Sequence, residues 1–151
     1  MPGEVAQEGQ PVVAVGTVYW AFDLDLWQNP YAVARVMGVK LWSREHFDAM
    51  LPVMKMLADA GQKSITASIM HHPWNGQTED PFCSMIQRTL TVDGQWKYDY
   101  TVFDRWVEFM TREVGITGTI DCYTMIPWAL QFDYYDQASN TVKFVNARPQ
   151  D

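Results

Sequence analysis

Three β-rich segments alternate with helical segments along this chain, and that alternation limits the folds it can adopt. Apolar and β-branched residues gather at 17–24, 64–70 and 116–122. Between the first two lies a helical stretch, in which apolar side chains recur every three or four residues behind Ser43, a favoured helix N-cap. Strands separated by helices pair in parallel through right-handed crossovers. The sequence therefore predicts an α/β fold with a parallel sheet.

Proline, glycine, N-cap and turn residues predict where the helices and strands begin and end. We expect Pro52 to kink or divide the first helix and Gly61 to end it. A second helix is expected from Thr101, read as its N-cap, to Gly115. Two hairpins are predicted, one pairing 84–91 with 95–100 around Asp93-Gly94 and one pairing 130–135 with 141–147. A parallel α/β barrel needs eight strands and about 250 residues. We therefore expect a partial (β/α)8 TIM barrel, made of its first three βα units with inserted β-hairpins.

Composition excludes several classes of partner. The net charge is -7 without any Lys/Arg cluster, which argues against nucleic acid and against an anionic membrane surface. No apolar run reaches membrane-spanning length, so we expect no membrane partner. The two cysteines, Cys83 and Cys122, do not have metal-like spacing. Two unpaired thiols packed as small apolar groups are favoured, although sequence alone cannot judge a single bridge. Gly-x-Ser-x-Gly and phosphate-binding glycine loops are missing from the sequence, and we expect neither metal nor cofactor.

Aromatic and polar residues follow each β-rich segment directly. Because the carboxyl ends of parallel strands share one edge of a sheet, we expect these residues to form one site. Seven Trp and seven Tyr fit stacking platforms for carbohydrate, but a large aromatic core would give the same count. The candidate substrate-binding residues are Asp25, Trp27, His71, Trp74, Asn75, Gln77, Tyr123 and Trp128.

Each candidate also has a purely structural explanation. His71 could bind a sugar hydroxyl or only the loop backbone, and Trp74 and Trp128 could stack on a sugar or merely pack the loops. Asp25 could anchor the Asn29-Pro30 turn, Asn75-Gly76 is itself a turn signal, and Tyr123 could be a core residue with a hydrated hydroxyl. His72 should face away from His71, because neighbouring strand residues point to opposite faces. That makes the pair a poor metal chelate.

Four segments resemble glycoside hydrolase family 123, whose catalytic domain is also known as domain of unknown function 4091. They are LDLWQNPYAVAR at 24–35, MKMLADAGQK at 54–63, PWNGQT at 73–78 and CYTMIPW at 122–128. The resemblance implies a (β/α)8 barrel preceded by a β-sandwich. Residues 1–16 would be a disordered segment or the remnant of that preceding β-domain, and residues 17–151 the truncated N-terminal part of the barrel.

The resemblance also implies an activity. The family hydrolyses β-linked N-acetylgalactosamine with the substrate's own acetamido group as nucleophile, a recognised exception to the two-carboxylate scheme. A consecutive Asp-Glu pair orients that group and supplies the acid. This sequence contains no Asp-Glu dipeptide, and the resemblance places the pair shortly after Asp151, so no catalytic residue can be assigned. Two positions also depart from the pattern, Asp121 where Asn is expected and Thr124 where Ser is expected.

The sequence thus suggests a glycosidase fragment that is inactive alone and lacks the C-terminal part of its barrel. It would supply substrate-binding loops for hydrolysis of β-linked N-acetylhexosamine glycans. The alternative is a non-catalytic carbohydrate-binding protein or a truncated remnant. The resemblance suggests a secreted or periplasmic parent, whereas the first residues do not form a signal peptide. Localisation therefore stays open.

Overall fold

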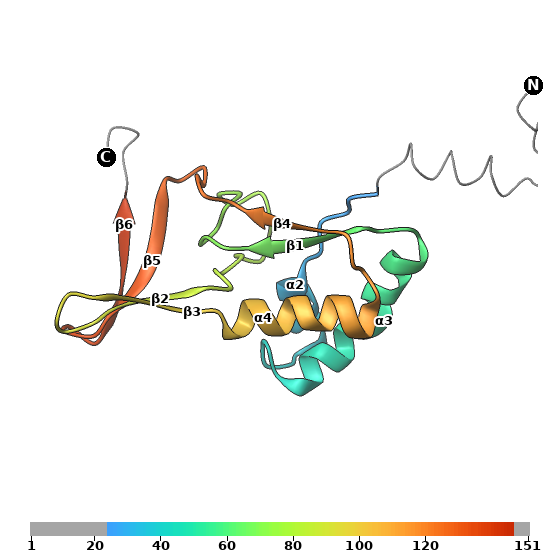
Figure 1. Cartoon of the computed structure of the whole chain (residues 1–151), viewed down its shortest axis with the longest axis horizontal. Coiled ribbons are helices and arrows are strands. Elements are labelled where there is room, and N and C mark those ends of the chain that lie inside the picture. Colours follow the sequence, from blue (N-terminus) through green and yellow to red (C-terminus); the bar gives the residue numbers. More distant parts are fainter. Residues whose placement is uncertain (1–23, 147–151) are drawn as a thin grey trace, which may run out of the picture.

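The computed structural model describes residues 24–146 as a mixed α/β fold (Figure 1). These residues form helices, one π-helical segment and strands in the order α2 (Pro30–Met37), α3 (Arg44–Asp59), β1 (Ser64–Ser68), β2 (Gln87–Leu90), β3 (Trp96–Asp99), α4 (Thr101–Glu108), η1 (Phe109–Val114), β4 (Thr119–Tyr123), β5 (Gln131–Asp136) and β6 (Thr141–Asn146). No helix in this part of the chain has the length and apolarity needed to cross a membrane.

The strands belong to two sheets. Strands β1 and β4 pair in parallel, with Ser64 opposite Thr119 and Ser68 opposite Tyr123. The other sheet has the order β3-β2-β5-β6, in which a short parallel contact between β2 and β5 joins two antiparallel hairpins. Figure 1 shows this sheet at one end of the molecule, with α3 and α4 along the β1–β4 pair. The described strands do not close into a barrel.

The main core lies between β1 and the helices. It contains Met50 and Met54 of α3, Ile65 of β1, Trp106 of α4 and Met110 of η1, all of them buried. The apolar residues of α3 and of the α4–η1 helical segment therefore pack against β1. Trp106 also donates its indole N–H to the Thr66 carbonyl at 3.0 Å, so this ring is buried with its polar atom satisfied. Gly118 is required where the chain enters β4, because a Cβ there would lie 2.2 Å from the Lys63 carbonyl oxygen.

The first predicted strand, 17–24, falls outside the described residues except for its last position. Leu24 forms an isolated parallel bridge with Gln62, just before β1. Both predicted hairpins are confirmed within the described residues, as is the N-cap of α3, where Ser43 Oγ accepts from the His46 amide at 3.3 Å.

Several predicted details are wrong. Of the two effects expected of Pro52, division of the helix does not occur, because α3 is one helix from Arg44 to Asp59. The Asp48 carbonyl, which loses its helical partner there, belongs to an exposed residue and can be hydrated. Thr101 is the first residue of α4, and Tyr100 occupies the N-cap position. The Thr101 amide donates to Asp99 Oδ1 at 2.8 Å, so the side chain of Asp99 satisfies an amide at the start of the helix.

Helix α2 was not expected. The Asn29-Pro30 dipeptide fits a turn, but it starts a helix: Asn29 Oδ1 accepts from the Ala32 amide at 3.0 Å, and Pro30 occupies the first turn. Gly38 ends the helix in the left-handed conformation, with φ of 62°. The start and stop signals were therefore present in the sequence.

The cysteines are confirmed as free thiols, but both are exposed rather than packed in the interior. Partial desolvation of the sulfur atom nevertheless raises the pKa of each thiol above its ordinary value. The negative charge of Asp133 adds to this increase for Cys83, and that of Asp121 adds to it for Cys122.

Candidate functional site

The parallel pairing of β1 and β4 brings their carboxyl ends together. The Ile69 amide, just past β1, donates to the Tyr123 carbonyl at 2.6 Å, and the Trp128 amide donates to the Pro73 carbonyl at 3.4 Å. The loops that follow the two strands are thus connected by backbone hydrogen bonds. This edge is where open parallel α/β sheets place ligands.

Three aromatic residues from separate segments meet at this edge. Ring centroids are 5.0 Å apart for Trp27 and Trp74, 5.1 Å for Trp27 and Tyr123, and 5.0 Å for Trp74 and Tyr123. Trp27 keeps 52% of its surface exposed, whereas Trp74 keeps 6% and also packs against Phe82 at 4.6 Å. We call Trp27, Trp74 and Tyr123 the strand-tip cluster. Within the cluster, the Trp27 ring is accessible to solvent, and the buried Trp74 ring packs against it.

Two carboxylates, Asp25 and Asp121, act electrostatically on Tyr123 of this cluster. Asp25 accepts a hydrogen bond from Ser64 Oγ at 2.7 Å, which connects the segment before α2 to the start of β1. Burial, together with the negative charges of Asp25 and Asp121, raises the pKa of the Tyr123 phenol. Tyr123 therefore stays protonated at neutral pH and can donate a hydrogen bond. An exposed indole face, a phenol donor and a carboxylate acceptor are suitable groups for recognising a sugar ring.

The His71 ring packs against β6 rather than within the strand-tip cluster. Its ring contacts Phe144 of β6 at 5.2 Å between centroids, and its buried Nδ1 has no hydrogen-bond partner. His72 was expected on the opposite face, but the two imidazole centroids are only 5.7 Å apart. Strand alternation does not apply here, because β1 ends at Ser68 and His72 adopts a left-handed φ of 49°.

The other expected residues border the loops. Asn75 and Gln77 are exposed. Their backbone amides donate to the backbone carbonyls of His72 and Trp74, respectively, within a tight turn. Trp128 is 66% exposed, and its ring does not contact the other aromatic rings of the described residues. The structure thus brings Trp27, Trp74 and Tyr123 together, whereas Asp25 is hydrogen-bonded to Ser64 at the start of β1 and the other candidates lie in the loops. A binding role for each of them stays a prediction.

Two buried glutamines behind the site were missed. Gln28 Oε1 accepts from the Thr66 amide at 2.6 Å, and its Nε2 donates to the Leu26 carbonyl at 2.6 Å. Gln62 Nε2 donates to the Ser64 carbonyl at 2.8 Å, and its Oε1 accepts from the Leu26 amide at 2.8 Å. The two side chains hold the segment that carries Trp27 against β1. Sequence reasoning had no signal for this, since glutamine is mostly exposed.

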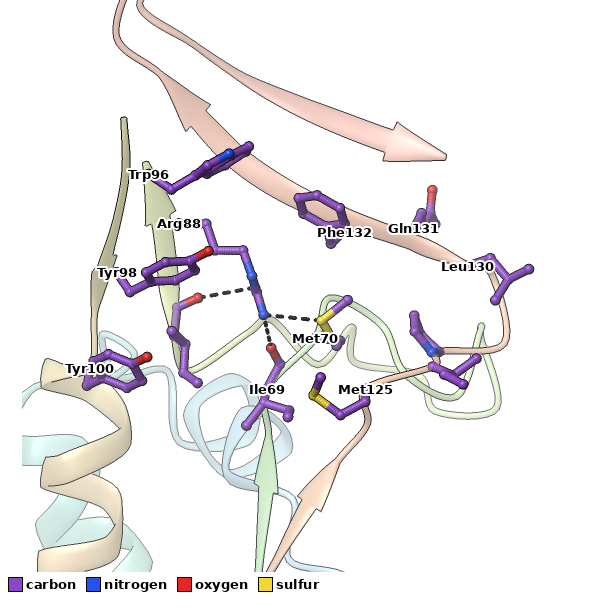
Figure 2. A pocket seen from close by; sticks show the side chains of 13 residues that line it. Ile69, Met70, Arg88, Trp96, Tyr98, Tyr100, Met125, Leu130, Gln131 and Phe132 are labelled. Carbon is purple, nitrogen blue, oxygen red and sulfur yellow. Dashed lines mark hydrogen bonds between the residues drawn. The ribbon is translucent and has the colours of Figure 1, made fainter. Parts of the chain in front are cut away.

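A pocket of about 800 Å³ lies next to the strand tips, between the loops and the four-stranded sheet (Figure 2). Ile69, Met70, Met125, Ile126 and Pro127 line it from the two loops. The sheet and the residues next to it contribute Ile86, Arg88, Trp96, Tyr98, Tyr100, Leu130, Gln131 and Phe132. None of the expected binding residues lines this pocket.

Arg88 is the charged residue among those that line the pocket. Its Nη2 donates to the Ile69 carbonyl at 2.6 Å and lies 3.1 Å from Met70 Sδ, while its Nη1 donates to Ser84 Oγ at 3.2 Å. Figure 2 shows the guanidinium turned toward the Ile69 carbonyl and the Met70 sulfur. Among residues 24–146, no group of three or more His, Cys, Asp or Glu side chains is placed to hold a metal ion.

Comparison with known proteins gives consistent results. Residues 27–151 match the family model described as "Glycoside hydrolase 123, catalytic domain". Among solved structures, a family 123 glycoside hydrolase from Clostridium perfringens, studied for glycolipid glycan hydrolysis, superimposes with a TM-score of 0.76 at 30% identity. The match covers 83% of this chain and 23% of that chain, so this chain spans about a quarter of that protein's length. A comparison with curated proteins gave no match. Because the family model covers most of its length, this chain belongs to glycoside hydrolase family 123.

Proposed function

We propose that this chain is the N-terminal part of a (β/α)8 glycosidase domain and supplies part of its substrate-binding face. The observation that carries the proposal is the match of residues 27–151 to the catalytic domain of the family. Strands β1 and β4 would be neighbouring barrel strands, and the two hairpins would be insertions at their carboxyl ends. In barrels of this kind the substrate binds at that end.

The proposed substrate is a glycan ending in a β-linked N-acetylhexosamine, with N-acetylgalactosamine favoured. Family membership and the glycolipid glycan substrate of the Clostridium perfringens enzyme support this choice. Trp27 would stack its exposed indole on the sugar, and Asp25 would accept from a hydroxyl. Tyr123 would donate to the acetamido oxygen, a role that needs the protonated phenol described above. His71, Asn75, Gln77 and Trp128 would border the same site.

The chemical step would need residues that this chain does not supply. In a substrate-assisted reaction one carboxylate positions the acetamido group and a second carboxyl group protonates the leaving oxygen. The sequence has no Asp-Glu dipeptide that could take these roles. We therefore expect the chain alone to bind sugar without turning it over, and a polypeptide that adds the rest of the domain to be active.

The test compares the two polypeptides on chromogenic β-N-acetylgalactosaminide, β-N-acetylglucosaminide and β-galactoside. The longer protein should cleave the first best and the third not at all, because β-galactoside lacks the acetamido nucleophile. Inactivity of the longer protein on every amino sugar would contradict the proposal. If it binds these sugars without cleaving them, the protein is a non-catalytic carbohydrate-binding protein.

Residue roles can be tested by calorimetric binding of N-acetylgalactosamine to the longer protein. Trp27→Ala should weaken binding by about 1–3 kcal/mol, by analogy with aromatic stacking on nucleic acid bases. Trp128→Ala removes an exposed ring that only borders the proposed site and lies outside the strand-tip cluster, so it should weaken binding less. Equal losses in the two variants would contradict the assignment of Trp27 as the platform.

A further inference from the structure

We propose that the pocket between the loops and the four-stranded sheet binds the apolar aglycone of a glycoside whose sugar lies on the strand-tip cluster. This inference rests on the proposed function and adds the chemical nature of the group beyond the sugar. It concerns residues that were not expected at any site.

The segments after β1 and β4 contribute to both the pocket and the strand-tip cluster. Ile69 and Met70 directly follow β1 and precede His71, while Met125 and Ile126 come just after Tyr123. The amides of Ile69 and Met70 both donate to the Tyr123 carbonyl, at 2.6 and 3.3 Å. A ligand with a polar and an apolar end could therefore contact the cluster and the pocket at once.

The lining is suited to hydrocarbon rather than to a second sugar. Met, Ile, Leu, Pro and aromatic side chains make up most of it. A sugar ring needs several hydrogen-bond partners, and unpaired polar groups in such a pocket would be costly. A volume of about 800 Å³ is within the usual range for organic ligands.

Arg88 does not change this conclusion. Its guanidinium is occupied by the Ile69 carbonyl, the Ile86 carbonyl at 3.4 Å and Ser84 Oγ, and it lies 5.9 Å from the centroid of Phe132. These contacts hold the sheet against the loop after β1. The guanidinium thus links the four-stranded sheet to the loop after β1. Because its N–H groups already have partners, it is poorly placed to bind a sulfate or phosphate in the pocket.

The apolar groups are accessible to a ligand. Met125 and Ile126 are 80% and 73% exposed, and the rings of Trp96, Tyr98 and Tyr100 are exposed on the facing wall. Exposed apolar groups clustered around one hollow are a common mark of a binding surface. An alkyl chain entering there would cover several of them and gain the hydrophobic stabilisation that they lack in the free protein.

The test is calorimetric titration of the monomeric fraction of the 151-residue chain, isolated by gel filtration, with n-alkyl β-N-acetylgalactosaminides from methyl to octyl, each below its micelle concentration. Affinity should rise with chain length, by at most about fourfold per methylene, which corresponds to ~0.8 kcal/mol. Equal affinity for the methyl and octyl glycosides would overturn the proposal.

Matched variants show whether the gain comes from this pocket. Ile126→Asp places a charge among the lining residues and should abolish most of the gain from methyl to octyl. Met56→Asp is the control, because Met56 on α3 is equally exposed but lies outside the pocket. An unchanged gain in Ile126→Asp would overturn the proposal.

Repeating the series with alkyl glucosides separates this inference from the proposed function. A chain-length gain with both head groups, without preference for N-acetylgalactosamine, would keep the pocket and reject the proposed sugar. A preference for N-acetylgalactosamine without any chain-length gain would do the reverse.

Discussion

At the scale of single residues, side chains in one cluster have different tasks. Trp27 and Trp74 touch at 5.0 Å, yet the first is open to solvent and the second is enclosed by Trp27, Phe82 and Tyr123. Both tryptophans follow a predicted β-segment, so the sequence predicts that they meet but not which one is buried. That depends on packing between loops from distant parts of the chain.

Trp74→Ala should therefore act first on stability. Removing a buried indole leaves a cavity next to three rings, and we expect the free energy of unfolding to fall by about 3–5 kcal/mol. Trp128→Ala removes the same side chain from an exposed position and should change it by about 0.5 kcal/mol or less. Chemical denaturation of both variants gives the comparison. Similar small changes would show that Trp74 is not part of the folded core.

His46 provides a pH-dependent contribution to stability. It is fully buried, its Nδ1 accepts from the Trp42 amide at 3.1 Å, and its Nε2 donates to the Pro30 carbonyl at 2.8 Å. That arrangement requires the neutral ring. Burial lowers the pKa of His46 below its ordinary value of 6.5, by more than the hydrogen bond to Pro30 raises it. The unfolded chain thus binds this proton at a higher pH than the folded one.

The sign of the effect follows from this difference. Stability from His46 is complete above pH 6.5 and is lost as the pH falls from there through the lower folded pKa. His46→Leu should unfold more easily at neutral pH, because two polar groups lose their partner, but its stability should depend less on pH below 6.5. Denaturation curves between about pH 5 and 7 measure that slope. An equally steep slope in the variant would contradict the assignment.

At the scale of elements, side-chain amides take the place of a neighbouring strand. Strand β1 pairs with β4 along one edge, and on the other side Gln28 supplies the acceptor for the Thr66 amide. Gln28→Ala would leave that buried amide without a partner, so we expect a loss of about 1–3 kcal/mol in the free energy of unfolding. Gln87→Ala on β2 is the control, because its side chain is exposed, and it should cost about 0.5 kcal/mol or less. Equal costs would contradict the role of Gln28.

The elements also show what the sequence could predict. Helix α3, both hairpins and strands β1 and β4 could be predicted from local sequence, because each depends on apolar periodicity, a helix cap or a turn dipeptide. Helix α2 was missed although Asn29, Pro30 and Gly38 mark its ends, since Asn-Pro fits a turn equally well. The parallel contact of Thr89 with Tyr135, which merges the hairpins, was also missed. A pairing between residues so far apart has no local signal, and the pocket beside it could not be predicted for the same reason.

At the scale of the whole molecule, the two-stranded sheet is incompletely covered. Strand β1 is buried at every position, whereas most of β4 is exposed, including Ile120 at 41%. Among the described residues, β4 pairs only with β1 and so has one open edge. Open edges beside exposed apolar side chains favour association with other chains. This agrees with a domain that is completed by further polypeptide.

We expect the chain expressed alone to be poorly soluble or oligomeric, for that physical reason. Ile120→Lys should raise the monomeric fraction, because lysine on an edge strand opposes pairing with another chain. Val36→Lys is the matched control: it adds the same charge at an exposed apolar position of helix α2, away from any strand edge. Light scattering coupled to gel filtration measures the fraction. A parent chain that is already monomeric and melts cooperatively would contradict the open-edge argument, and equal improvement in both variants would assign the effect to net charge instead.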